Sequence, residues 1–265
     1  MATTFRNILL SLAAFCLLGV SSFAQRKVSS IAPPEEFSRV EISGFGAYLR
    51  SLPLKPEGSP VKLYDGTTKW WQGGAFAIID LDIGTADLQQ CADAVMRLRA
   101  EYLWHSKQYK AIHFNFTSGF RADYSRWAEG ERISVKGNKC SWYQATEPDY
   151  SYNTFRKYLN MVFSYAGTAS LSRELTSVSL PDAKIGDVFI LGGHPGHAMI
   201  IVDMAEDGKG RRAIMVAQSY MPAQSIHIVT NINNRKSSPW YVFDDDTTSF
   251  SFPEWEFSSD QLKRF

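Results

Sequence analysis

The chain has 265 residues, of which 45% are hydrophobic and 14% aromatic, and it carries 28 Lys and Arg residues against 27 Asp and Glu residues. This composition is typical of a globular protein with a buried core, and it excludes collagen and intrinsically disordered chains. A formal net charge of +1 without a long run of like charge argues against nucleic acid or an anionic membrane surface as a partner. Function therefore has to be inferred from a few residues.

The N-terminal segment predicts an export signal. An apolar run over residues 8–20 is followed by Ser22 and Ala24, small residues three and one positions before a predicted cleavage site ahead of Gln25. The run is too short to span a bilayer comfortably, and no later stretch of the sequence is both apolar and long enough to do so. We expect a signal peptide over residues 1–24 and an exported protein, periplasmic or extracellular, without a transmembrane segment.

Short elements are predicted in the first part of the mature chain. Residues 45–52 predict a helix that ends before a proline, since proline cannot continue a helix. Asp65-Gly66 predicts the turn of a hairpin over residues 61–71, because both central positions of such a turn need positive φ. Residues 75–81 show the pattern of a buried strand, and we expect these pieces to form a first small sheet.

The strongest helical pattern runs over residues 88–102, where apolar residues recur three or four positions apart. Asp87, followed by Gln90 three positions later, predicts a start similar to a capping box. Cys91 would then lie in the first turn or just past it. Charged residues such as Arg97 lie off the apolar stripe.

A long middle segment over residues 104–180 is rich in Tyr, Phe, Trp and Ser. It predicts a helix over residues 155–166 and a shorter helical piece over residues 169–175. Its aromatic residues could line a groove for glycan or peptide, since aromatic faces suit such ligands. Packing as a satellite core under long loops explains the same residues.

The last third of the chain predicts strands. Apolar, β-branched runs separated by turn residues occupy residues 187–191, 197–204, 213–219 and 226–230. This order indicates an antiparallel meander. With the helices, it predicts one α+β domain over residues 25–265, in which residues 104–180 are an inserted segment.

A cysteine near a helix start and a histidine at a strand start have the layout of a thiolate and imidazole pair. A helix N-terminus and a cationic imidazole both favour the thiolate of Cys91, which would be the nucleophile. Antiparallel pairing around a turn near residue 208 places His197 opposite Gln218, Ser219 or Tyr220. Gln218 could therefore orient the imidazole, as the third group of a triad does.

Three motifs point to a known superfamily: Gln90-Cys91-Ala92-Asp93, Ile185-Gly186-Asp187-Val188-Phe189-Ile190 and Gly196-His197-Ala198-Met199-Ile200-Ile201-Val202. They resemble the papain-like superfamily, especially its NlpC and CHAP-type cell-wall amidases. The resemblance implies a papain-like fold with a long insertion. It also implies that Cys91 is the nucleophile, His197 the general base and acid, and Gln218 the orienting group.

On the same resemblance, Gln89 or Gln90 would lie near an oxyanion site, and Ser219 is a further supporting candidate. The mature chain as a whole also resembles a family of exported bacterial proteins known only as a domain of unknown function. That broader resemblance implies no activity.

Each candidate residue also has a structural explanation. Free cysteine is among the most buried residue types, so Cys91 could be a core residue, or it could form a disulfide with Cys140. His194 and His197 are three positions apart, but no third ligand stands at a metal-binding spacing, so we expect no metal and no cofactor. His227 alternates with two isoleucines, which predicts a solvated strand face for it.

We therefore expect an exported papain-like cysteine hydrolase or amidase that acts on peptide bonds, including those of cell-wall peptides. Its working set would be Cys91, His197 and Gln218. The alternative is a non-catalytic exported domain on a related fold, which binds glycan or a partner protein through the aromatic middle segment.

Overall fold

A computed structural model describes residues 25–265, and the predicted signal peptide lies outside these residues. Its helices are α1 (Gly44–Ser51), α2 (Cys91–His105), α3 (Tyr124–Ala128), α4 (Tyr152–Tyr165) and α5 (Thr168–Glu174). Its strands are β1 (Ser38–Arg39), β2 (Ala75–Ile78), β3 (His113–Asn115), β4 (Arg121–Asp123), β5 (Glu131–Lys136), β6 (Lys139–Gln144), β7 (Thr176–Ser177), β8 (Val188–Leu191), β9 (His197–Glu206), β10 (Arg212–Gln218), β11 (His227–Val229), β12 (Tyr241–Phe243), β13 (Ser249–Ser251), β14 (Glu256–Ser258) and β15 (Leu262–Arg264). Short 3-10 turns lie at Val28–Ser30, Tyr109–Ala111, Leu180–Asp182 and Ser259–Gln261.

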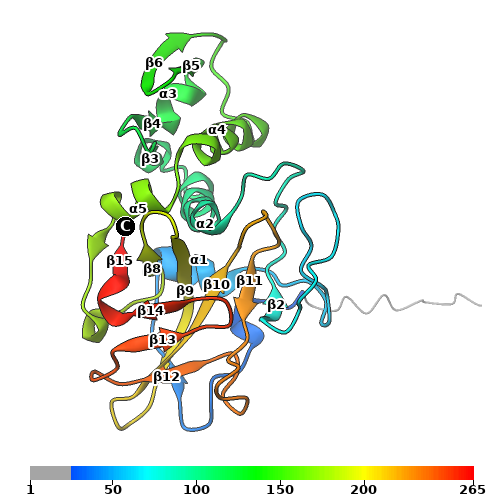
Figure 1. Ribbon diagram of the computed structural model, residues 1–265, viewed down its shortest axis with the longest axis vertical. Coiled ribbons are helices and arrows are strands. Elements are labelled where there is room, and N and C mark those ends of the chain that lie inside the picture. The colour runs from blue at the N-terminus through cyan, green and yellow to red at the C-terminus, as the bar shows by residue number, and fades with distance from the viewer. Residues whose placement is uncertain (1–24) are drawn as a thin grey trace, which may run out of the picture.

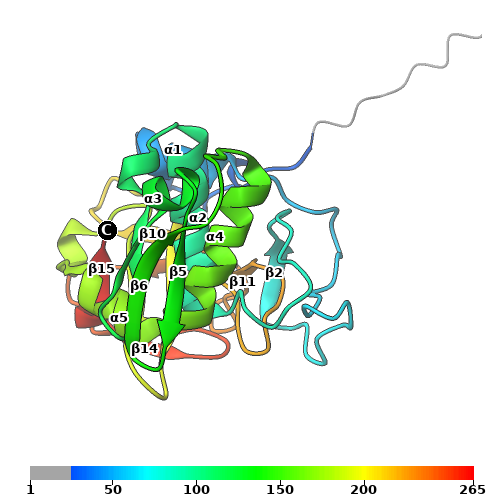
Figure 2. The same cartoon turned by 90° about the horizontal axis from the view of Figure 1, so that it is seen from above.

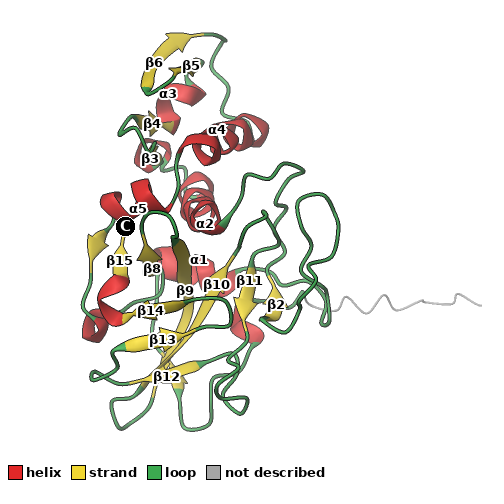
Figure 3. Cartoon of the chain, viewed as in Figure 1, coloured by secondary structure: helices red, strands yellow, loops and turns green. Residues whose placement is uncertain are grey.

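A large antiparallel sheet organises the chain (Figure 3). Its strands follow the order β2-β11-β10-β9-β8-β15-β7, while β1 pairs with the end of β9 and β12 with the start of β10. The predicted class is confirmed at this level, because the protein is α+β with an antiparallel sheet and a few helices. The strand β2 joins this sheet beside β11, so the expected separate small sheet is wrong.

Both faces of the central strands are covered, which explains their nearly continuous apolar sequence. Along β9, Ala198 and Ile200 face a core shared with α1 and α2, whereas Met199 and Ile201 face a second core. That second core includes phenylalanines of the β13–β14 hairpin, which crosses the sheet in Figure 1. Successive side chains of a strand point to opposite faces, so each face needs its own apolar set.

The helix α2 is buried on nearly all sides, since the sheet lies on one side of it and the middle segment on the other (Figure 1). Arg97, although off the predicted apolar stripe, is only 1% exposed. It pairs with Glu101 at 2.5 Å and also donates to Gln89 and to the hydroxyl of Tyr152. A buried charge needs such partners, and Tyr152 at the start of α4 helps to supply them.

The middle segment folds over α2 as the hairpins β3–β4 and β5–β6 with helices α3 and α4 (Figure 1), and Figure 2 shows β5 and β6 in its foreground. Tyr124 is fully buried, and Trp127 is 7% exposed. These two aromatic residues therefore belong to the core. Tyr143 and Tyr150 keep 51% and 41% of their surface exposed.

Two local predictions need correction. The Asp65-Gly66 turn forms, but its flanks make isolated pairings, of Lys62 with Thr68 and of Leu63 with Gln224, instead of strands. The predicted cap of the long helix is also displaced by three residues, because the helix begins at Cys91 after Gln90. Within residues 25–265, no helix has the length and apolar character needed to cross a membrane.

Candidate functional site

The first candidate, Cys91, is the first residue of α2. The backbone N–H of Gln90 donates to the Asp93 carboxyl at 3.0 Å, which is the reciprocal half of a capping box. Asp87, the predicted cap, instead accepts from the Gln90 side chain at 3.1 Å and from the Ala223 backbone at 2.7 Å. These bonds fix the chain on both sides of the cysteine.

His197 begins β9, and the structure brings Gln218 to it. The imidazole Nε2 and the Gln218 Oε1 are 2.7 Å apart. A bulge shifts the register, because Met215 pairs with Asp203 but Val216 pairs with Ile201. Continued to the strand end, this register places Tyr220 opposite His197 and Gln218 diagonally across, two residues away on the same face.

Ser219, between these two residues, points the other way. Its hydroxyl is fully buried, and its single proton has two backbone carbonyls within hydrogen-bond distance, those of Gln89 at 3.0 Å and Gln224 at 2.9 Å. Ser219 therefore supports the segment that leads into α2. The Gln89 side chain is also buried and accepts from Arg97, while its Nε2 has no hydrogen-bond partner among residues 25–265.

Cys91 and His197 line the same cavity, which has a volume of about 530 Å³. Gln90 lines it as well, whereas Gln89 and Ser219 do not. Other lining residues come from the His194–Gly196 loop, from the turn between α4 and α5, and from Tyr220, Met221 and Trp255. The cavity is thus built where α2, β9 and the end of β10 meet the first residues after α4.

Aromatic rings enclose the imidazole. The ring centroids of Tyr220 and Trp255 lie 5.0 and 5.2 Å from that of His197, and the Phe257 ring is stacked at 6.1 Å. Burial in this apolar surrounding lowers the pKa of His197 to about 4, against the opposing effects of Gln218 and Glu254. The imidazole is therefore neutral at neutral pH.

The thiol is neutral as well, which corrects the expected thiolate. Burial, followed by the neighbouring Asp93 carboxyl, raises the pKa of Cys91 to about 11. Backbone hydrogen bonds at Ala92 and Ala198 lower it by less. A helix N-terminus and a cationic imidazole were expected to lower the thiol pKa. Cys91 is only 7% exposed, however, and the imidazole carries no charge.

A polar network that the sequence does not predict surrounds the Gln218 amide. The Gln218 Nε2 donates to Glu254 at 2.6 Å, and Glu254 pairs with Lys69 at 2.5 Å. The same Nε2 is 3.3 Å from the Nε2 of His227, whose Nδ1 is 3.0 Å from the Ser225 carbonyl. His227 is fully buried, so its predicted solvated face is wrong; its strand β11 lies inside the sheet, between β10 and β2.

No local pattern could have identified Glu254 or Lys69. They are 185 positions apart and come from two loops, one after the Asp65-Gly66 turn and one in the β13–β14 hairpin. The one available signal was the pair of charged residues next to tryptophans, Lys69-Trp70 and Glu254-Trp255.

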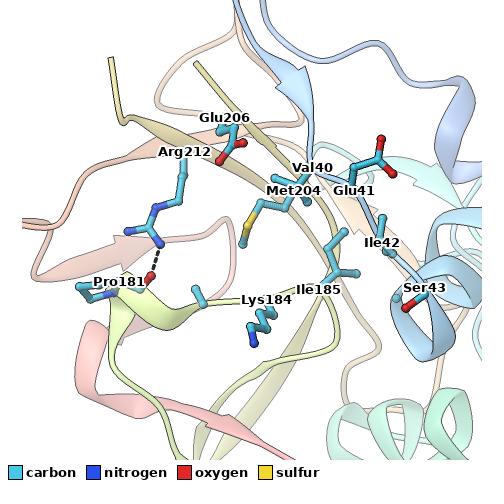
Figure 4. Close-up of a pocket in the computed structure, with 12 residues that line it drawn as sticks. Val40, Glu41, Ile42, Ser43, Pro181, Lys184, Ile185, Met204, Glu206 and Arg212 are labelled. Atoms are coloured by element: carbon cyan, nitrogen blue, oxygen red, sulfur yellow. Dashed lines mark hydrogen bonds between the residues drawn. The ribbon is translucent and has the colours of Figure 1, made fainter. Parts of the chain in front are cut away.

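Other features are weaker candidates for chemistry. A larger cavity of about 740 Å³ lies near the far end of β9, lined by charged residues of both signs, including Glu41, Lys184, Glu206 and Arg212 (Figure 4). Its lining contains neither cysteine nor histidine. Across residues 25–265, no group of three or more His, Cys, Asp or Glu side chains could hold a metal ion.

The alternative cysteine pairing is also wrong. Cys91 and Cys140 are both free thiols. Cys140 lies in β6 of the middle segment, where its sulfur is 3.8 Å from the Ser118 hydroxyl. The Cys91 thiol in the cavity is therefore not part of a disulfide.

Comparison with known proteins gives a family assignment. No curated protein and no solved structure matches the chain. One family model covers almost all of the described residues, from position 28 to position 264. The chain therefore belongs to the family described as Domain of unknown function (4846).

Proposed function

We propose that this protein is an exported papain-like cysteine hydrolase that cleaves amide or peptide bonds. The observation that carries the proposal is the shared cavity: the Cys91 thiol at the start of α2 and the His197 imidazole at the start of β9 both line it. The bond from His197 to Gln218 adds the third member, which orients the base. Export, predicted by the N-terminal segment, would bring the enzyme to cell-wall peptides.

In the proposed reaction, the thiol and imidazole start neutral. When a substrate carbonyl enters the cavity, the Cys91 sulfur attacks its carbon while the thiol proton moves to Nδ1 of His197. The imidazolium then gives that proton to the departing amine nitrogen as the C–N bond breaks, which leaves a thioester on Cys91. Water, activated by the neutral imidazole, hydrolyses the thioester and returns the proton to the sulfur.

The carbonyl oxygen becomes negatively charged during the attack and needs donors. Gln90 lines the cavity beside the cysteine, and we assign the oxyanion site to the Gln90 side chain together with the backbone N–H at the start of α2. The first N–H groups of a helix have no partner within the helix, which makes them suitable donors. Gln89 and Ser219 would act only indirectly, by holding this segment in place.

The test is hydrolysis of a peptide mixture that includes cell-wall peptides, followed by mass spectrometry. Cleavage should occur with the purified mature protein and be lost in Cys91→Ala and His197→Ala. The matched control is Cys140→Ser, which removes the other thiol of the mature chain and should retain full cleavage. Cleavage that survives in Cys91→Ala, or its absence from the folded wild-type protein with every amide offered, would contradict the proposal.

One observation favours a second candidate, a non-catalytic binding domain. The Cys91 thiol is 7% exposed and its pKa is raised, which are properties of a core cysteine. A domain of this kind would bind glycan or peptide in the cavity without cleaving it. Binding of cell-wall fragments that is equal in the wild type and in Cys91→Ala, without product, would identify it.

A further inference from the structure

We propose that Glu254 and Lys69 are positioning residues that fix which nitrogen of His197 carries the proton. The inference rests on the proposed function for its catalytic meaning, because only an unprotonated Nδ1 could accept the thiol proton. The geometry on which it depends is a chain of polar contacts from Lys69 through Glu254 and Gln218 to His197.

The charged groups of Lys69 and Glu254 determine which group donates and which accepts in each of these hydrogen bonds. The Lys69 ammonium can only donate, and the Glu254 carboxylate can only accept. Glu254 therefore accepts from Lys69 at 2.5 Å on one oxygen and from a Gln218 amide N–H at 2.6 Å on the other. A Gln218 oxygen turned toward Glu254 would place two acceptors in contact.

His227 constrains the other amide proton. Its Nδ1 is 3.0 Å from the Ser225 carbonyl, so that nitrogen carries the proton, and Nε2 of the neutral ring is an acceptor. The Gln218 Nε2 is 3.3 Å from it and donates its second N–H there. Both amide protons of Gln218 are then used on the side away from His197.

The Gln218 oxygen must consequently face His197, and oxygen can only accept. The His197 Nε2, 2.7 Å away, is therefore the protonated nitrogen, and Nδ1 keeps its lone pair. Lys69 is 9% and Glu254 13% exposed in their side chains, so water competes little for these bonds. The charged pair, together with His227, thus determines the tautomer of an imidazole to which neither Lys69 nor Glu254 is hydrogen-bonded.

Histidine tautomers can be measured without any substrate. Long-range proton–nitrogen correlation spectra of histidine-labelled protein distinguish a protonated ring nitrogen from an unprotonated one. The wild-type spectrum at neutral pH should show His197 protonated at Nε2 only. A ring protonated at Nδ1, or at both nitrogens, would overturn the proposal before any variant is made.

Glu254→Gln should reverse the direction of the hydrogen bonds that run from residue 254 through Gln218 to His197. The new amide must turn its oxygen toward the Lys69 ammonium and its N–H₂ toward Gln218. Gln218 then flips, gives up its N–H bond to the Nε2 of His227 and offers N–H to His197. His197 should move toward the tautomer protonated at Nδ1. Adding Lys69→Met frees the amide of residue 254 to turn its oxygen back, and the Nε2 tautomer should return.

The matched control is Glu256→Gln, which removes an exposed carboxylate two positions along the same hairpin and should leave the spectrum of His197 unchanged. A folded Glu254→Gln protein with an unaltered tautomer, or a double variant that fails to restore it, would overturn the proposal. These spectra are recorded without substrate, so they do not depend on peptide cleavage. Failure to cleave peptides would therefore count against the hydrolase alone, and a wrong tautomer would count against the positioning role alone.

Discussion

Gln218 and His197 are 21 positions apart in the chain, yet the Gln218 Oε1 and the His197 Nε2 are 2.7 Å apart at the ends of two neighbouring strands. The bulge in β9 and the alternation of side chains along β10 place both on the same face of the sheet. Because this bond uses Nε2, Nδ1 is the nitrogen left for exchange with a thiol. The bond thus links the packing of the sheet to the chemistry proposed for the cavity.

The raised pKa of Cys91 predicts slow alkylation. At about pH 8 in the folded protein, iodoacetamide should modify Cys91 more slowly than Cys140, and the rate at Cys91 should rise with pH up to about 11. Mass spectrometry of proteolytic fragments measures both sites in one sample. Faster modification of Cys91 than of Cys140 at neutral pH would contradict burial as the dominant effect.

Asp93→Asn should increase the reactivity of Cys91. The Asp93 carboxyl is the second cause of the raised thiol pKa, while an asparagine oxygen can still accept the Gln90 N–H that begins the helix. Burial also raises the pKa of Asp93 well above its usual range, so the alkylation rate of Cys91 should increase several-fold at the pH values at which the Asp93 carboxyl of the wild type is ionised. Asp87→Asn, a change in the same cavity, should leave the rate near that of the wild type; equal rates in all three proteins would refute the effect of Asp93.

The two buried imidazoles predict a loss of stability in acid. Burial lowers the pKa of His197 and of His227 from 6.5 to about 4. The unfolded chain therefore binds these protons first, and the stabilisation present above pH 6.5 is lost as the pH falls to 4. A shift of this size corresponds to a loss on the order of 3 kcal/mol for His197.

Urea unfolding across that pH range, with the wild type and His197→Gln compared, measures this term. The variant should show a shallower decline in unfolding free energy. His194→Gln, which changes an exposed histidine of the adjacent loop, should decline like the wild type. Parallel curves for wild type and His197→Gln would show that the imidazole is not held neutral by the fold.

Ser219→Ala tests whether Ser219 stabilises the fold or takes part directly in peptide cleavage. The buried hydroxyl contacts the carbonyls of Gln89 and Gln224, and its removal should cost about 1–3 kcal/mol of unfolding free energy. Because Ser219 does not line the cavity, peptide cleavage by the folded variant should persist. Ser249→Ala, at an exposed position of β13, is the neutral comparison. Complete loss of cleavage in a folded Ser219→Ala protein would show a direct role instead.

Sequence periodicity predicted the elements that are long or strongly apolar. The helices α1, α2, α4 and α5 and the strands β2 and β8 to β11 lie close to the predicted ranges. It missed the short strands, such as β15, whose place beside β8 depends on the return of the C-terminal chain. Two or three residues carry too little pattern to be recognised alone.

The candidate site was predictable where strand alternation or helix starts determine it, as for Cys91, His197 and Gln218. It was not predictable where loops distant in sequence meet, as for Lys69 and Glu254. The sign of the pKa shift at Cys91 also required the structure, since the middle segment and the sheet bury both sides of α2.

The most direct test of the proposed hydrolase is the search for a thioester on Cys91. Mature protein would be mixed with an activated acyl ester, quenched in acid at successive times, digested and analysed by mass spectrometry. The account predicts an acyl mass on the Cys91 fragment that forms and then decays in the wild type, is missing from His197→Ala, and stays off Cys140. An adduct confined to Cys140, or one on Cys91 that forms equally in His197→Ala, would contradict it.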